Sequence, residues 1–357
     1  MAMEAGRRRM RGLGFSAHGG LDRLGWVDVP SPEPGPGEVR VRVRAAAFNR
    51  LDRFVLQGLP GVPIELPHVL GSDAAGIVDR IGPDIRDLAV GAEVVVNPGL
   101  WDATCEYCRA GQESCCRNFR ILGEHTQGSA TEFVVVPRRN IHAKPSTWTW
   151  AQAAAAPLVF QTAWRALHSV GELKPGETVA VIGAGGALAP AAIQVAHRLG
   201  GRVVVVGRDA GKVERAAALG AEAGLVMTPE KPHDRLLWEW SDKRGIDLIF
   251  DSVGSATVPR SVQALARRGR VVVVGATEGG KVEINLATLF WRQASIRGST
   301  MASRTDFEEV YAELLQGRLA PVVDSEWDWD RGVDAFRRLA DPDVFGKVVL
   351  KSSDSNR

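Results

Sequence analysis

The sequence predicts an α/β protein with two domains, one rich in β-strands and one built on a doubly wound parallel sheet. Short strands separated by glycine-bearing turns fill the first 147 residues, and strands alternate with helices from about residue 148 onward. The length of 357 residues also suits two domains of roughly 100–200 residues each.

The β-rich part is clearest at residues 39–44, where VRVRVR alternates valine with arginine. A period of two is that of a strand with one buried and one solvated face. Further short strands are predicted at 74–80, 93–97 and 132–136. Closely spaced strands of this kind favour a small barrel or sandwich.

The second part begins with a helix-like stretch over 151–171. Strands and helices then alternate, which is typical of a parallel sheet. The predicted strands are 178–182, 203–206, 248–250 and 271–274, and the predicted helices are 190–199, 212–219 and 258–267. From about residue 302 the elements are mixed, with a helix around 330–339 and a final strand at 347–350.

Composition excludes several functional classes. A formal charge of +2 gives no electrostatic reason to expect nucleic acid or a membrane surface as a partner. Apolar runs stay short of the ~20 residues that a membrane span needs. Arg7, Arg8 and Arg9 lack the apolar stretch of a secretion signal, so we expect a short disordered leader, a fold that starts near Met10, and a cytoplasmic protein.

A glycine-rich turn, GAGGALA at 183–189, follows the strand 178–182 directly. Small residues there let the backbone approach a pyrophosphate, and the next helix directs its N–H groups at that charge. Pro190 suits the first turn of that helix. The context of a strand followed by a helix predicts dinucleotide binding.

The end of the second strand of this sheet indicates which dinucleotide is bound. An NAD site needs an acid there, but Gly207 and Arg208 follow the strand, and Arg208 with Lys212 could hold a 2′-phosphate. Asp209 could be mistaken for the NAD acid, but we expect it to cap the helix that carries Lys212. The sequence therefore favours NADP(H) and leaves NAD open.

Four cysteines lie close together in the first domain. Cys105 and Cys108 have the spacing of a zinc-binding turn, and one of the adjacent Cys115 and Cys116 can join them. Asp102 could supply a fourth ligand and close a structural site. A lobe of free thiols without metal remains the alternative.

Several motifs in order resemble the medium-chain dehydrogenase/reductase superfamily, which includes the zinc-type alcohol dehydrogenases and the quinone oxidoreductases. The resemblance runs from about Met10 to Leu350. The motifs are FNRLDRFVLQG (48–58), GSDAAGIVDRIG (71–82), the cysteine lobe, ILGEHTQGSATEFVVVP (121–137), PLVFQTAW (157–164), FDSVG (250–254), GSTMAS (298–303) and FGKVVL (345–350).

The resemblance implies a GroES-like domain over 10–147, a Rossmann domain over 148–301 and a C-terminal return to the first domain over 302–357, with the active site between the domains. It also implies Cys116 as the fourth lobe ligand, and a homodimer or homotetramer formed through an edge strand near 294–300. The cofactor residues that it implies, with those of the glycine turn and the second strand, are Thr162, Gly183, Gly186, Leu188, Ala189, Arg208, Lys212, Ser252, Val253, Gly275, Thr300 and Met301.

The departures from the zinc-dependent members concern the catalytic metal. The family's ligand positions hold Asn49, Ser72 and Leu158, and its nearby glutamate is Asp73. An aliphatic side chain cannot coordinate zinc, and an amide or a hydroxyl is a poor ligand. His68 and His125 stand at no ligand position, and we interpret them as structural. A catalytic zinc is therefore not expected.

Two hydroxyl groups of related enzymes are also missing. The family's proton-relay hydroxyl is replaced by Leu51, and a tyrosine donor of some metal-free members is replaced by Phe54. Asn49 and the GSDAAG motif resemble the metal-free quinone oxidoreductases and enoyl reductases. We expect the proton to come from solvent.

These features predict NADPH-dependent reduction of a quinone or an α,β-unsaturated carbonyl, because a conjugated acceptor delocalises the incoming charge. Asn49 would orient the substrate oxygen or the nicotinamide amide, and Ser72 would donate a hydrogen bond. Structural roles for Asn49, Ser72 and Asp73 are the alternative. Two other functions stay open: a specialised biosynthetic reductase of a ketone or imine, and a non-catalytic NADP(H)-binding protein.

Overall fold

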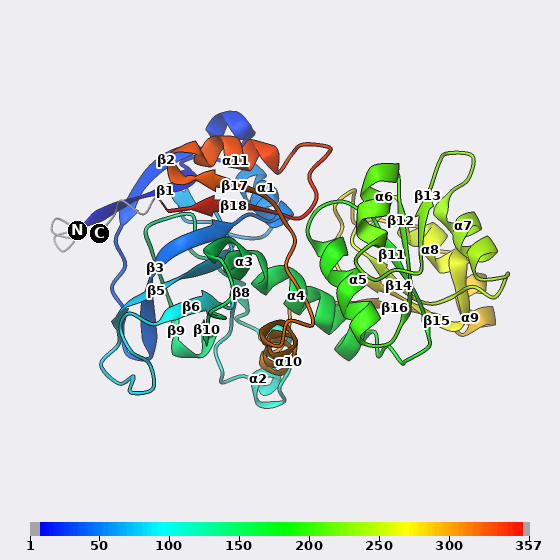
Figure 1. Ribbon diagram of the computed structural model, residues 1–357, viewed down its shortest axis with the longest axis horizontal. Coiled ribbons are helices and arrows are strands. Elements are labelled where there is room, and N and C mark those ends of the chain that lie inside the picture. Colours follow the sequence, from blue (N-terminus) through cyan, green and yellow to red (C-terminus); the bar gives the residue numbers. More distant parts are fainter. Residues whose placement is uncertain (1–7, 353–357) are drawn as a thin grey trace. The chain divides into compact units, whose positions relative to one another are not determined.

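The structure, a computed structural model, describes residues 8–352. It consists of two compact units (Figure 1). The first contains the residues up to Leu158 and those from Pro321 onward, and the second is Val159–Ala320. The first strand begins at Arg9, near the expected start of the fold, whereas residues 1–7 of the expected leader lie outside the described residues. Within residues 8–352, no helix is long and apolar enough to cross a membrane.

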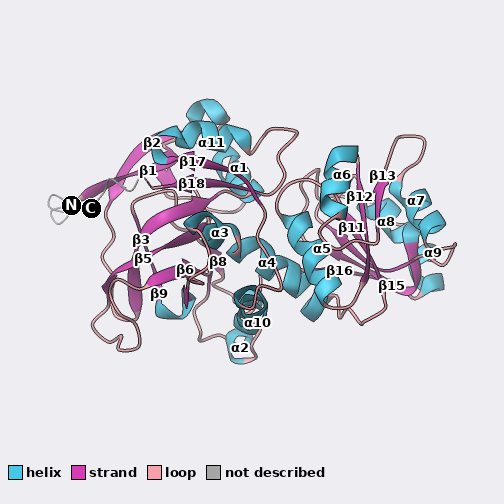
Figure 2. Cartoon of the chain, in the orientation of Figure 1, coloured by secondary structure: helices cyan, strands magenta, loops and turns pink. Residues whose placement is uncertain are grey.

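The first unit is mainly β-structure (Figure 2). A seven-stranded sheet follows the order β10-β6-β5-β3-β18-β17, with β9 also paired to β3, and a smaller sheet has the order β2-β1-β4. The strands are β1 Arg9–Phe15, β2 Gly25–Pro30, β3 Glu38–Ala47, β4 His68–Val69, β5 Asp73–Ile81, β6 Glu93–Val96, β7 Gly99–Leu100, β8 Arg120–Ile121, β9 Phe133–Pro137, β10 Ile141–Ala143, β17 Val323–Asp328 and β18 Lys347–Lys351. The helices are α1 Arg50–Gln57, α2 Glu106–Arg109, α3 Trp150–Ala155 and α11 Gly332–Arg338.

Strand β3 is the centre of the first unit. The predicted strand at 39–44 lies inside it, and Val39, Val41 and Val43 are buried as the alternation requires. The expectation that the arginine face is solvated is wrong for Arg40, which is also buried. Its guanidinium pairs with Glu33 and Asp79, both at 2.6 Å, so its charge is compensated where water is excluded.

The second unit is a six-stranded parallel sheet in the order β13-β12-β11-β14-β15-β16, with helices around it. This order reverses at β11, as in a doubly wound nucleotide-binding sheet. The strands are β11 Thr178–Ile182, β12 Arg202–Gly207, β13 Ala223–Val226, β14 Ile246–Asp251, β15 Leu265–Val273 and β16 Ser295–Gly298. The helices are α4 Pro157–Trp164, η4 Arg165–Val170, α5 Leu188–Arg198, α6 Ala210–Ala217, α7 His233–Trp240, α8 Val258–Ala264, α9 Leu286–Arg292 and α10 Arg304–Leu315.

Helix boundaries explain two differences from the expected domain limits. Helix α3, expected in the second domain, packs against β3, β5 and β18 and so belongs to the first unit. Helix α10, expected in the C-terminal return, belongs to the second unit, where buried Asp306 accepts a 2.8 Å bond from Arg165. The predicted helix 258–267 also ends early, because strand β15 begins at Leu265.

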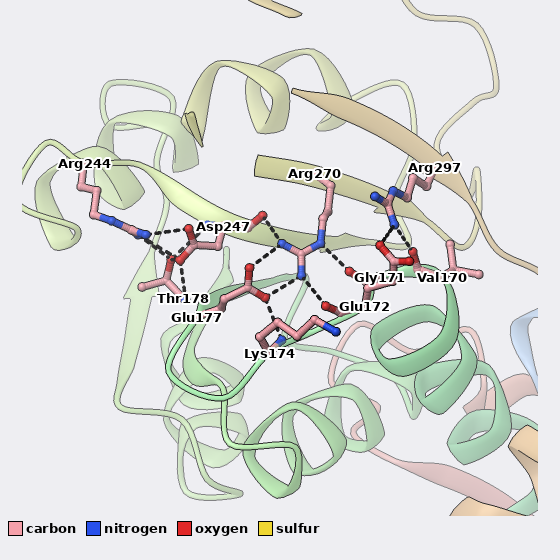
Figure 3. Close-up of polar contacts among 10 residues, drawn as sticks. All are labelled: Val170, Gly171, Glu172, Lys174, Glu177, Thr178, Arg244, Asp247, Arg270 and Arg297. Carbon is pink, nitrogen blue, oxygen red and sulfur yellow. Dashed lines mark hydrogen bonds and ion pairs between the residues drawn. The ribbon is translucent and has the colours of Figure 1, made fainter. Parts of the chain in front are cut away.

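A buried arginine fastens the amino-terminal end of the parallel sheet (Figure 3). Arg270 of β15 binds both carboxylate oxygens of Glu177, at 2.9 and 2.6 Å, and also donates to the main-chain oxygens of Gly171, Glu172 and Asp247. A planar guanidinium suits such a set of acceptors better than an ammonium would. These bonds lie at the amino-terminal ends of the strands, whereas the glycine turn follows the carboxyl end of β11.

Candidate functional site

The predicted catalytic residues lie where three strand ends meet in the first unit. Strand β3 ends at Ala47, and its antiparallel neighbours β5 and β18 begin beside that end. Asp73 stands opposite Ala47 on one side and Val349 stands opposite it on the other. Because side chains two apart in a strand share a face, Lys347 and Asn49 are brought to the same face as Asp73.

These three side chains form a closed set of hydrogen bonds. The Asn49 Nδ2 group donates to Asp73 Oδ2 at 2.8 Å. Lys347 Nζ donates to that oxygen and to Asn49 Oδ1, both at 2.6 Å. The other carboxylate oxygen of Asp73 accepts the backbone N–H of Leu158 at 2.8 Å. Asp73 and Lys347 are fully buried, so the ion pair is desolvated and compensated on both sides.

The donor set does not fit a catalytic zinc. Leu158 contributes a backbone N–H instead of a ligand, and both oxygens of Asp73 already accept hydrogen bonds. Ser72 is buried, and its hydroxyl has no hydrogen-bond partner among residues 8–352. A buried polar group without a partner calls for an explanation, and a substrate oxygen is one.

Asp52 supports the backbone on which Asn49 stands. Asn49 is the N-cap of α1, and the Asp52 carboxylate accepts the backbone N–H groups of Asn49 and Gly71, both at 2.7 Å. Burial raises the pKa of Asp52 to about 6, although these two bonds oppose the shift. In the same capping box the Asn49 side chain accepts the backbone N–H of Asp52, so the structural role given as the alternative for Asn49 is present together with the side-chain bonds above.

A second acidic side chain lies near Asp52. Gly123 touches the backbone of Gly71, where an added Cβ would come within 2.2 Å of the Gly71 oxygen. Glu124 follows, with 12% of its side chain exposed. Burial, and to a lesser degree the charge of Asp52, raises the pKa of Glu124 to about 7. Sequence reasoning missed this residue, because nothing in the local pattern shows what covers it.

The two histidines considered as substitute ligands have structural contacts. His68 Nε2 lies 3.0 Å from the Gly123 oxygen, and burial lowers its pKa. His125 Nδ1 accepts the backbone N–H of Ile121 at 3.2 Å. These contacts agree with the structural interpretation of both residues.

The predicted cofactor residues of the second unit follow the carboxyl ends of its strands. Gly183 and Gly186 have φ values of +96° and +72°, which L side chains rarely adopt, and an added Cβ at Gly186 would meet nothing within 4 Å. This open turn between β11 and α5 fits a dinucleotide pyrophosphate. Other predicted residues follow other strands of the same edge: Arg208 after β12, Ser252 and Val253 after β14, Gly275 after β15, and Thr300 and Met301 after β16. Leu188 and Ala189 begin α5, and Thr162 is buried on α4.

The residues predicted to distinguish the two dinucleotides have defined contacts. Asp209 caps α6, and its Oδ1 accepts the Lys212 backbone N–H at 2.9 Å, which confirms the predicted cap. The Lys212 ammonium lies over the glycine turn, 3.3 Å from where a Cβ on Gly185 would stand. Arg208 is exposed and lies 3.3 Å from Glu278.

One positioning residue of the cofactor half was not predicted. Asp251, fully buried at the end of β14, accepts the backbone N–H groups of Val253 and Gly254 and the hydroxyls of Thr257 and Ser261. These bonds fix the loop that carries Ser252 and Val253. The FDSVG motif contained Asp251, but only the structure shows its four donors.

The cysteine lobe brings together the four predicted ligands. The ligand atoms of Asp102, Cys105, Cys108 and Cys116 lie within 4.8 Å of one another, whereas Cys115 is exposed. Cys105 and Cys108 have their sulfurs 3.6 Å apart. The N–H of Thr104, then Asn118, hold the pKa of Asp102 well below its usual range, so it is a carboxylate. Three thiolates and a carboxylate fit a closed tetrahedral zinc site.

Comparisons with known proteins match the first unit and the second unit to dehydrogenase families. Residues 35–146 match the family "Alcohol dehydrogenase GroES-like domain" and residues 187–316 match "Zinc-binding dehydrogenase". An NAD-dependent alcohol dehydrogenase of Sulfolobus acidocaldarius is 30% identical over 80% of this chain and 82% of its own length. An acryloyl-coenzyme A reductase of Metallosphaera sedula is also 30% identical, over 80% and 84%.

Solved structures give the same result. A structure of an NAD-dependent alcohol dehydrogenase is 40% identical and covers 96% of this chain and 100% of its own, with a TM-score of 0.89. A crotonyl-CoA carboxylase/reductase in complex with NADP is 27% identical and covers 96% and 95%, with a TM-score of 0.88.

The raised pKa of Glu124 predicts a pH-dependent effect on stability. A carboxyl group whose pKa is raised by folding stabilises the fold below its ordinary pKa, and this contribution is lost as the pH rises through the folded value, here about 7. We expect Glu124→Gln to melt at a higher temperature than the native chain at about pH 8, and at nearly the same temperature at about pH 5. Exposed Glu65→Gln is the control. Equal pH profiles for the native chain and Glu124→Gln would contradict the burial of this carboxyl.

Proposed function

The chain belongs to the medium-chain dehydrogenase/reductase superfamily and is an oxidoreductase that uses a nicotinamide cofactor, and from this premise we propose that it is an NADPH-dependent reductase of α,β-unsaturated carbonyl compounds. The observation that carries the proposal is the group of Asn49, Ser72, Leu158 and Asp73, in which the Asn49 amide and the Ser72 hydroxyl are the hydrogen-bond donors left for a substrate. It offers hydrogen bonds where zinc-dependent relatives hold a metal. Its chemistry suits an acceptor that spreads the incoming negative charge itself.

The relatives support the class of substrate. Acryloyl-coenzyme A reductases and crotonyl-CoA carboxylase/reductases are among them, and both names describe conjugated thioesters. In such a reaction a bound nicotinamide supplies a hydride to the β-carbon, and the α-carbon gains a proton. The protein's part is to hold the carbonyl oxygen, for which Asn49 and Ser72 are the proposed donors. A quinone remains a second acceptor of the same electronic kind.

Alcohol oxidation is the competing function, because other relatives are named NAD-dependent alcohol dehydrogenases. An alkoxide gains most from a Lewis acid. Leu158 cannot coordinate a metal ion, and both carboxylate oxygens of Asp73 already accept hydrogen bonds, so these positions offer no ligand set for a metal. We therefore favour the reductase.

We further propose NADP(H) as the cofactor, one structural zinc and a dimer or tetramer of the chain. Arg208 and Lys212 could bind a 2′-phosphate, and the nearby acid Asp209 is engaged as a helix cap. Self-association is supported by an exposed apolar surface at the edge of the sheet. Helix α9 exposes Leu286 by 70%, Phe290 by 64% and Trp291 by 71%, and the adjacent edge strand β16 exposes Ile296 by 39%.

The activity is tested by following NADPH oxidation with an acryloyl thioester, a simple enone, a quinone and a saturated ketone. We expect the conjugated acceptors to react at least about 100-fold faster than the saturated ketone, the scale on which one donor to a developing oxyanion acts. Chelators should leave the rate unchanged in the assay. Faster turnover of the saturated ketone, which is the reverse of alcohol oxidation, would favour the dehydrogenase, and cofactor binding without any turnover would favour a non-catalytic protein.

The cofactor preference is tested with Arg208→Ser. Because charge-assisted bonds to the 2′-phosphate would be lost, the KM for NADPH should rise about 10- to 100-fold while that for NADH changes little. Arg202→Ser, at the other end of β12 and paired with Glu222, is the matched control. An equal effect on both cofactors would place Arg208 outside the phosphate site.

The zinc is tested by metal analysis of the purified chain, with one zinc per chain expected. Cys116→Ser should lose the metal and lower the melting temperature, because a closed zinc site contributes folding energy. Cys115→Ser should keep the metal and the native melting temperature, because Cys115 is exposed and is not one of the four grouped residues. A metal content unchanged in Cys116→Ser would contradict the site.

Self-association is tested by light scattering of Trp291→Glu combined with Ile296→Lys. Charges at a buried apolar interface should reduce the native assembly to single chains. Trp238→Glu, at an exposed tryptophan of α7, is the control. A native protein that is already monomeric would refute this part of the proposal.

A further inference from the structure

We propose that Lys347 is a positioning residue whose buried ammonium holds the Asn49 amide in one orientation, so that Asn49 can offer the substrate only an N–H. This inference rests on the proposed function, because it names the group that sets the geometry of the reducing site. It concerns the first unit alone.

The hydrogen-bond inventory of Asn49 leads to this conclusion. A side-chain amide has two acceptor sites on oxygen and two protons on nitrogen. The oxygen accepts from Lys347 Nζ at 2.6 Å and from the backbone N–H of Asp52 in the capping box of α1, and one nitrogen proton goes to Asp73 at 2.8 Å. The other nitrogen proton is directed to no acceptor among residues 8–352. Since Asn49 is 8% exposed, this N–H is the part of the amide that remains for a ligand.

The charges of Lys347 and Asp73 fix the orientation of the Asn49 side-chain amide. In the opposite orientation the amide nitrogen would face the ammonium of Lys347, and the amide oxygen would face the carboxylate of Asp73. Both contacts would be repulsive at 2.6 and 2.8 Å, where no water can intervene. The orientation is therefore set by charge.

This arrangement matches the proposed reaction. When hydride adds to the β-carbon of a conjugated carbonyl compound, the electron pair of the double bond moves toward the carbonyl oxygen, which becomes negative until the α-carbon takes a proton. A fixed N–H aimed at that oxygen stabilises the charge without reorganisation. The ammonium on the Asn49 oxygen also polarises the amide and strengthens its N–H as a donor.

A purely structural role is the competing explanation for Lys347, and a double-mutant cycle separates the two. Lys347→Met is measured in the native chain and in Asn49→Ala, with an enoyl thioester and NADPH. We expect kcat to fall about tenfold or more in the native background, with the KM for NADPH within about twofold, and no further fall in the Asn49→Ala background. Equal falls in both backgrounds, or an unchanged kcat, would overturn the proposal.

Two additions keep the test decisive. Lys347→Met leaves Asp73 without its counter-ion, so Lys347→Met/Asp73→Asn, which removes both charges, is measured as a second route to the same loss of kcat. Lys351→Met, on the same strand but in an exposed pair with Glu326, is the control and should keep the native kcat.

A readout that is independent of turnover distinguishes this inference from the proposed function. The side-chain amide signal of Asn49, identified by nitrogen-15 NMR through its loss in Asn49→Ala, should move in Lys347→Met and stay in place in Lys351→Met. If the signal moves but no enone is reduced, the proposed function fails and the geometry stands. If the signal stays in place in Lys347→Met, the inference fails whatever the substrate.

Discussion

The buried ion pair between Lys347 and Asp73 is the contact on which the proposed substrate site depends. It joins residues 274 positions apart in the chain, and brings the last strand beside the centre of the first sheet, where β18 lies next to β3 (Figure 1). Without Lys347 the carboxylate would be buried with only amide donors, and without Asp73 the ammonium would keep a single oxygen as its partner. Each charge therefore makes the burial of the other possible, and both act on Asn49.

The cofactor half depends on a different principle, the shared direction of parallel strands. Because all strands of the second sheet run in the same direction, the predicted residues from five separate loops lie at the carboxyl ends of the strands without any long-range charge pair. Asp251 and Asp209 then fix individual loops by accepting backbone N–H groups. Arg270 binds Glu177 at the other end of the strands, the amino-terminal end (Figure 3). Binding and stabilising groups are thus separated along the strands.

The sequence predicted the features that repeat locally. The two-residue period gave β3, and the apolar runs gave β11, β12, β14 and β15. Strand β13 and helices α7, α9 and α10 were missed, because β13 and α9 bury no residue, and α7 and α10 include polar His233 and Asp306 among their buried residues, which weakens the apolar pattern. Spacing also grouped Asp102 with the cysteines. Lys347 was read only as the start of a strand, since its role depends on a register between segments that local pattern cannot show.

The same ion pair limits the chemistry that the site can support. A metal ion accepts an electron pair from a substrate oxygen directly, whereas in the proposed site the Lys347 charge would act on the substrate through the Asn49 amide. Stabilisation through one polarised N–H, with the Ser72 hydroxyl as a second donor, is weaker than coordination to a metal. A substrate that delocalises its own negative charge over a conjugated system needs no more than this. The proposed preference for conjugated acceptors thus follows from how the charge would be delivered as well as from the missing ligands.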